Sequence, residues 1–105
     1  KSANTVFSCY CSKVVIGEEI PSVFEIKKDC ICIFTEKKQK ILRFESISRI
    51  LLRNRFNRHS SLEIFSVKGK TYLLDFHPLN NSQIVQHISH NLPNFILLTF
   101  SYHRK

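Results

Sequence analysis

Four cysteines have the spacing that most readily suggests chemistry, since they form two Cys-x-Cys pairs that could be disulfides or zinc ligands. The pairs are Cys9 with Cys11 and Cys30 with Cys32, each in an apolar run of extended character. Residues i and i+2 of a strand share a face but lie about 6.5–7 Å apart, which is awkward for a disulfide. Zinc-binding cysteines usually have two to four residues between them, because the chain must curl around the metal. We therefore expect reduced, metal-free core thiols in a reducing compartment, with disulfides and zinc as the alternatives.

The histidines and serines offer little further chemistry. His59 precedes Ser60 and Ser61, which places a base beside two hydroxyls, but neighbouring residues of a strand point to opposite faces. His87 and His90 could share a ligand on a helix, although a solvated helix flank is the simpler interpretation. The sequence has no Gly-x-Ser-x-Gly, no His-Glu-x-x-His and no phosphate-binding glycine loop. We expect neither enzymatic activity nor a cofactor.

Basic residues form the second candidate site. The chain has 16 Lys and Arg against 8 Asp and Glu, a net charge of +8, which attracts phosphates, anionic lipids or acidic proteins. Between Lys37 and Arg58 the only acid is Glu45. From Arg49 to Arg58 all the basic residues are arginines, which pair well with carboxylates and phosphates. The candidate partner- or anion-binding residues are Lys37, Lys38, Lys40, Arg43, Arg49, Arg53, Arg55, Phe56 and Arg58.

The arginines at the centre of this stretch carry the functional expectation. Alternation along an extended chain would place Arg53 and Arg55 on one face, with Arg58 within reach. Little acid lies nearby in sequence, so we expect an external partner to relieve their repulsion. We expect reversal of the charges of Arg53 and Arg55 to weaken association with the neighbouring domain and barely to change the melting temperature of the isolated domain, because exposed charges contribute little to stability. The alternative is a solvated loop and strand edge whose charge discourages aggregation.

Two common partners of basic domains are not expected here. Specific phosphoinositide binding is disfavoured because Glu18 and Glu19 in the first turn would repel a headgroup, and only Lys13 precedes them. Nucleic acid is disfavoured because an RNA-binding face needs exposed aromatic residues among the basic ones, whereas most Phe here lie at strand positions typical of a core. Weak attraction to anionic membranes through the arginines remains an alternative.

The order of elements predicts a mainly β domain. Alternating apolar residues predict seven short strands, at about residues 6–16, 22–26, 30–34, 40–44, 47–52, 61–67 and 71–76, with 53–59 as a loop or strand end. A helix is then predicted over about 81–92, because an apolar stripe has helical spacing, at Ile84, Val85, Ile88 and Leu92. Asn80, Asn81 or Ser82 can cap its start, and Pro93 ends it.

Seven antiparallel strands in a barrel or sandwich, capped by one C-terminal amphipathic helix, form the pleckstrin-homology (PH) superfold, which serves many kinds of recognition. We expect the PH-like domain to span residues 1–94. The apolar tail 95–105 would be a linker to a following domain or, alternatively, an additional strand on this domain's own edge. No apolar run is long enough to cross a bilayer. The sequence does not begin with Met, and we expect it to be part of a larger protein.

Residues 41–76 resemble the PH-like domain that precedes the BEACH domain in BEACH-domain proteins, the neurobeachin-like family. The specific part is an isoleucine-rich strand end, an arginine-rich stretch (Arg53-Asn54-Arg55-Phe56) and the strand Ser61-Leu62-Glu63-Ile64-Phe65. The family often has two adjacent arginines and a tyrosine where this chain has Arg-Asn-Arg-Phe.

The resemblance implies a non-catalytic module of a large cytoplasmic scaffold in vesicle, lysosome and membrane trafficking, docked on the adjacent BEACH domain through residues 49–58. The alternative function is a peripheral membrane domain that binds anionic phospholipid through the same basic surface.

Overall fold

The computed structural model describes residues 5–56, 58–79, 81–93 and 95–104. Seven strands precede one helix, and an eighth strand follows it. In order, the elements are β1 (Thr5–Val15), β2 (Glu18–Lys27), β3 (Cys30–Thr35), β4 (Gln39–Arg43), β5 (Ile47–Arg55), β6 (Arg58–Ser66), β7 (Thr71–Asp75), α1 (Asn81–Asn91) and β8 (Leu97–Arg104), with a 3-10 turn at Phe44–Ser46. The fold is mainly β and PH-like, as the sequence predicts.

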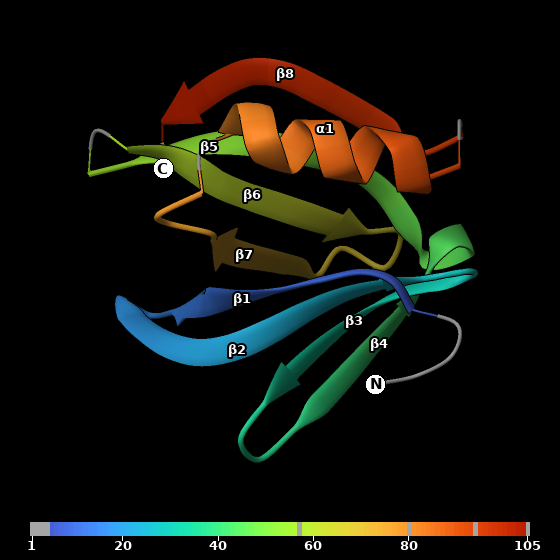
Figure 1. Ribbon diagram of the computed structural model, residues 1–105, viewed down its shortest axis with the longest axis horizontal. Helices are drawn as coiled ribbons and strands as arrows, with labels where there is room; N and C mark the ends of the chain where they lie inside the picture. Colours follow the sequence, from blue (N-terminus) through green and yellow to red (C-terminus); the bar gives the residue numbers. More distant parts are fainter. Residues whose placement is uncertain (1–4, 57, 80, 94, 105) are drawn as a thin grey trace.

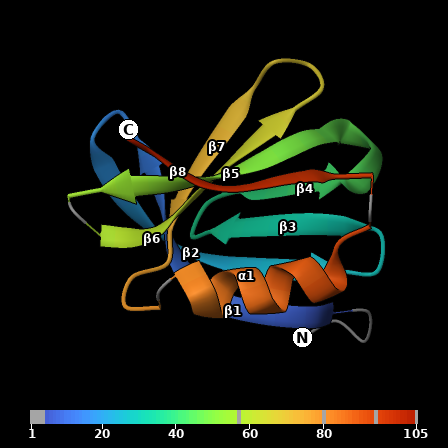
Figure 2. The same cartoon turned by 90° about the horizontal axis from the view of Figure 1, so that it is seen from above.

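The strands form one strongly curved sheet in the order β4-β3-β2-β1-β7-β6-β5-β8. Figure 1 shows the β1–β4 meander below the β5–β7 layer, with α1 lying against the upper layer. Strand β1 connects the two layers, because it pairs with β2 along its length and with β7 only over Ser12–Val14. The two layers are therefore joined at one corner, where β1 pairs with β7, and α1 packs against both β1 and β6 (Figure 2).

The core comes from the alternating inward positions of both layers. Phe24 of β2 is fully buried and meets Phe76 edge to face, with ring centroids 5.2 Å apart. Helix α1 contributes Ile84 and Ile88, which are also buried, so the predicted helical stripe is confirmed. His87 on the helix stacks on Phe7 of β1 at 4.7 Å, which fixes α1 against the first strand. None of the helices among the described residues has the length and hydropathy needed to cross a membrane.

Two segments differ from the simplest sequence prediction. The segment 53–59, predicted as a loop or strand end, lies mostly in strands. Strand β5 continues to Arg55, β6 begins at Arg58, and these two arginines pair in register across the turn. The turn is made possible by Phe56, whose φ of 53° is left-handed. Of the two alternatives for the tail, the structure has the strand: β8 pairs with β5 in parallel along this domain's own edge.

Candidate functional site

The β5–β6 hairpin holds a buried ion pair that joins its two strands. Arg53 of β5 approaches Oε1 of Glu63 on β6 with both Nε and Nη2, each at 2.7 Å. Glu63 alternates with the core residues Leu62 and Ile64, so its side chain is on the face of the sheet opposite the core. The two side chains are nevertheless only 14% and 3% exposed. The pair is therefore shielded from solvent although it lies on the face of the sheet opposite the core.

Asp75 at the end of β7 is the second buried acid, and it forms ion pairs with two arginines. Its Oδ2 accepts hydrogen bonds from Arg55 Nη1 at 3.1 Å and from Arg58 Nη2 at 2.9 Å. Its Oδ1 accepts from Ser60 Oγ at 2.8 Å and from the His77 backbone N–H at 3.0 Å. Burial alone would raise the pKa of Asp75, but the His77 and Ser60 hydrogen bonds and the two guanidiniums together lower it below its ordinary value.

A third acid reaches the same cluster from the first hairpin. Oε2 of Glu19, on β2, lies 3.5 Å from Arg55 Nη1 and 4.0 Å from Arg58 Nη2. The expectation that little acid relieves the repulsion among Arg53, Arg55 and Arg58 is therefore wrong. The acids are distant in sequence, from 10 residues between Arg53 and Glu63 to 39 residues between Arg58 and Glu19, and the fold brings them to the arginines.

Phe56 is the exposed feature of this hairpin. Its side chain is 74% exposed at the tip of the turn. The guanidinium carbon of Arg55 lies 4.7 Å from its ring centroid and that of Arg58 lies 5.8 Å away, distances that allow cation–π contact. Arg58 is itself 35% exposed, whereas Arg55 is 9% exposed. We call Arg55, Phe56 and Arg58 the arginine–phenylalanine tip.

Arg49 and Arg43, two further predicted site residues, lie away from this tip. Arg49, near the start of β5, is exposed and places its guanidinium carbon 4.5 Å from the ring centroid of Phe65. Arg43, at the end of β4, lies 3.8 Å from Asp29 and 3.7 Å from Glu45, and all three side chains are more than half exposed. Ion pairs that exposed contribute little to stability.

The predicted lysines form a separate group with one lysine that sequence reasoning did not include. Lys37 and Lys38 of the β3–β4 turn line a pocket of about 410 Å³ together with Lys13 of β1. The ammonium groups of Lys13 and Lys40 lie 6.0 and 5.8 Å from the centroid of the Tyr72 ring. We call Lys13, Lys37, Lys38 and Lys40 the lysine mouth. The expected basic surface is therefore two groups on different hairpins.

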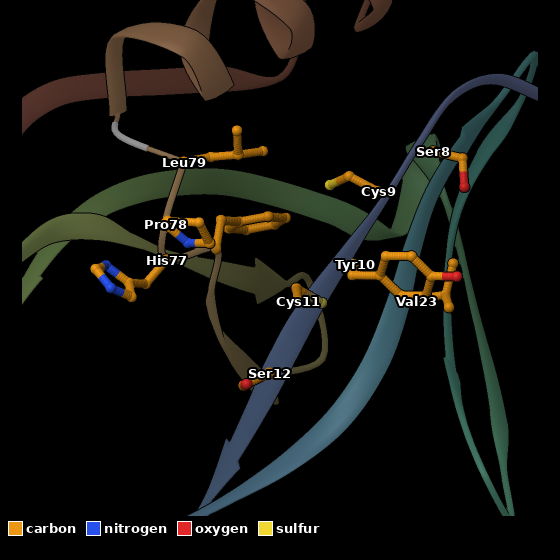
Figure 3. A pocket seen from close by; sticks show the side chains of 10 residues that line it. Ser8, Cys9, Tyr10, Cys11, Ser12, Val23, His77, Pro78 and Leu79 are labelled. Carbon is orange, nitrogen blue, oxygen red and sulfur yellow. The ribbon is translucent and has the colours of Figure 1, made fainter.

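A larger pocket, of about 620 Å³, lies between β1 and the β7–α1 connection (Figure 3). Cys9 and Cys11 border it together with His77, residue types that could form a nucleophile and a base. Burial raises the pKa of Cys9 to about 11 and, with smaller contributions from Cys9 and Asp75, that of Cys11 to about 12. Figure 3 shows the His77 ring pointing away from both thiols. These thiols are therefore protonated at neutral pH, unlike those of cysteine nucleophiles.

The other two cysteines lie together on β3. Cys30 and Cys32 are 7% and 1% exposed, and their sulfurs are 3.8 Å apart as free thiols. Cys32 pairs in register with Glu25 and alternates with the core residues Ile31 and Ile33. The sequence expectation of buried thiols is confirmed for this pair and for Cys11, while Cys9 is half-buried.

Comparison with known proteins identifies the fold. No family model matches the sequence, and no curated protein matches it. The chain is similar to the C-terminal domain of an unknown protein from Leishmania infantum, with a TM-score of 0.69, 12% identity and 81% of each chain covered. It is also similar to the structure of the Spt16D Pob3N heterodimer, with a TM-score of 0.64 and 6% identity, covering 95% of this chain and 56% of that one. At such identities the likeness concerns the fold alone.

Proposed function

We propose that this domain is a non-catalytic PH-like interaction module that docks on an adjacent BEACH-type domain through the arginine–phenylalanine tip. The observation that carries the proposal is Phe56, a large aromatic side chain that is 74% exposed at a φ of 53°. Bulky residues rarely adopt this left-handed conformation, which costs on the order of 1–3 kcal/mol. Strain of this kind at an exposed aromatic residue is a reason to expect a contact outside the domain.

The residues of the tip are of the types that dominate protein interfaces. Aromatic residues and arginine are enriched in interface cores and among the residues that contribute most binding energy. Arg55 and Arg58 are already held by Asp75, so the ring they flank loses little further freedom when a partner binds. In this proposal Arg58 contacts the partner, while Arg53 and Arg55 hold the hairpin in place through their ion pairs with Glu63 and Asp75.

The partner's nature is inferred from charge and from the resemblance. A net charge of +8 favours an acidic partner surface. Arg49 extends the exposed basic character along β5, on the segment where the resemblance to BEACH-associated domains is most specific. The proposal therefore includes a cytoplasmic scaffold of vesicle, lysosome and membrane trafficking, in which this module performs no chemistry. The protonated thiols of the larger pocket support the non-catalytic part.

Photocrosslinking in the full-length protein tests where the tip docks. A photoreactive phenylalanine analogue replaces Phe56, and Tyr10, an 85% exposed aromatic residue on β1, is the matched control position. We expect crosslinks from position 56 to the adjacent BEACH-type domain, and few from position 10. Crosslinks from position 56 only to lipid or to solvent would contradict the proposal.

A further inference from the structure

The pairing between β1 and β7 stops early and leaves a fork between the two chain segments that follow. The last pair in register is Ser12 with Asp75. If the same antiparallel register continued, residues 8–11 would stand opposite residues 76–79. These two segments instead border the pocket of about 620 Å³ (Figure 3). The fork is therefore a place where a strand pair opens and leaves room between its two sides.

The chain after β7 bends away from β1, and its hydrogen bonds hold it there. The Phe76 N–H donates to a carbonyl of β6 at 2.8 Å, and the His77 N–H donates to Asp75 Oδ1 at 3.0 Å. Pro78 has no N–H, and the Leu79 N–H donates to the Phe76 carbonyl at 2.8 Å. Every N–H on that side of the fork is therefore satisfied within the domain.

The β1 side of the fork has no such partners. Among the described residues, no strand pairs with residues 8–11 from this side and no other backbone hydrogen bond reaches them. Alternate residues of an antiparallel strand direct both N–H and C=O to the same side, so two of these four residues direct theirs to the fork. Unpaired main-chain groups at a strand edge can pair with a further strand.

The side chains of the fork indicate what kind of strand would fit. The ten residues that line it include no Asp, Glu, Lys or Arg, although the domain has a net charge of +8. Figure 3 shows the side chains of Cys9 and Leu79 directed toward one another across the fork, and Phe76 is buried. An apolar side chain can enter between them, whereas a charged one would lose its hydration without gaining a partner.

We propose that the fork binds an extended, uncharged peptide segment of a partner protein, which pairs with β1 beside residues 8–11 and places an apolar side chain between Cys9 and Leu79. In this mode of recognition main-chain hydrogen bonds supply affinity, and pockets for alternate side chains supply specificity. Four residues of β1 offer an edge of about 13 Å, which suits a short segment. None of the residues of the arginine–phenylalanine tip lines the fork, so the two proposals stand or fall independently.

Binding of short peptides to the domain tests the fork. The probes are four capped heptapeptides in which Thr alternates with apolar residues, and the central apolar residue is Val, Ile, Leu or Phe. Amide NMR spectra of the isotope-labelled domain follow the titration. We expect at least one peptide to bind saturably, to shift the amide signals of residues 8–11 and to slow hydrogen exchange there. Absence of binding by all four would overturn the proposal.

Backbone methylation distinguishes strand pairing from simple apolar contact. N-methyl groups on alternate residues of the tightest peptide remove the donors of one edge only, and a second peptide carries them on the other edge. The peptide whose methyl groups face β1 should bind at least about tenfold more weakly, while the other stays within about threefold. Equal affinities would mean that only a side chain is held, and would overturn the proposal.

Substitutions in the fork locate the peptide. Leu79→Glu places a carboxylate there, and Val67→Glu, on the exposed β6–β7 turn, is the matched control. We expect Leu79→Glu to weaken binding at least about tenfold and the control to leave it unchanged. Circular dichroism checks folding, and Cys9→Phe, which fills the fork from β1, is used if Leu79→Glu does not fold.

Two results of these measurements would contradict a peptide in the fork. Unchanged affinity in the folded fork variant would place the peptide elsewhere on the domain. Concentration-dependent dimers without peptide, with the amides of residues 8–11 protected, would mean that a second copy of the chain occupies the fork. Either result would overturn the proposal.

Discussion

Arg53 and Glu63 form a two-pronged ion pair across the β5–β6 hairpin, in which both Nε and Nη2 of the arginine meet one carboxylate oxygen at 2.7 Å. Their strands place them diagonally, because Arg53 is opposite Ser61 and Glu63 is opposite Leu51. A one-residue slip of either strand would separate them, because the side chain on the slipped strand would turn to the core face while its partner stayed on the opposite face. The pair therefore favours the observed register.

Removing the acid of this pair should be costly. Glu63→Gln leaves the guanidinium of Arg53 largely buried without its counter-charge, and we expect it to lower the free energy of unfolding by about 3 kcal/mol. Urea denaturation measures the change. Glu45→Gln is the control, since that carboxylate is 70% exposed and should contribute less than about 1 kcal/mol. Equal effects of the two substitutions would contradict the role of burial.

The sequence predicts that charge reversal at Arg53 and Arg55 barely changes the melting temperature, but that prediction assumed exposed arginines, whereas both side chains are largely buried. The reversal should therefore destabilise the domain. Each new glutamate would face a buried carboxylate, Glu63 or Asp75. We expect the double variant to melt far below wild type or to fail to fold, by circular dichroism. A nearly unchanged melting temperature would show that the arginines are free in solution.

Acid should weaken the domain through Asp75. Its pKa is lower in the folded state than the ordinary value near 4, so its contribution is complete above that value and is lost as pH falls through the folded pKa. We expect the free energy of unfolding to drop below about pH 4. Asp75→Asn should be less stable at neutral pH and should lose less stability on acidification. Parallel pH profiles for the two proteins would contradict this assignment.

Cys32 should behave as a buried apolar residue. Cys32→Ser places a hydroxyl at a site that is 1% exposed, and we expect it to lower the free energy of unfolding by about 2 kcal/mol. Cys9→Ser, at a half-buried site, should cost less. Thiol titration of denatured protein without reductant should count four free thiols, and a count of two or none would contradict reduced cysteines.

Most of the fold follows from local patterns that the sequence displays. Alternating apolar residues locate the strands within a few residues, because one face of each strand is buried. The helical spacing of Ile84 and Ile88 identifies α1, and Pro93 marks where it ends. The tail was ambiguous, since an apolar strand suits an edge of its own sheet as well as a neighbouring domain.

The candidate site was less predictable, because it depends on strand register. Sequence reasoning found the arginines, yet their partners Glu63 and Asp75 come from other strands and are apparent only once β5, β6 and β7 are aligned. One signal was present in the sequence, since Glu63 and Asp75 each lie between two apolar residues of a strand. That alternation places both carboxylates on the face opposite the core, where they could meet the arginines. Tyr72, which brings Lys13 and Lys40 together, had no comparable signal.

The central claim is that the arginine–phenylalanine tip docks on an adjacent domain, and Phe56→Asn tests it most directly. Titration calorimetry between this domain and the domain that follows it in its parent protein gives the affinity, with Tyr10→Asn as the control. We predict at least tenfold weaker association for Phe56→Asn, as expected for an aromatic interface residue, with an equal or higher melting temperature because Asn tolerates the left-handed φ. Unchanged affinity of Phe56→Asn, or an equal loss for Tyr10→Asn, would contradict the claim.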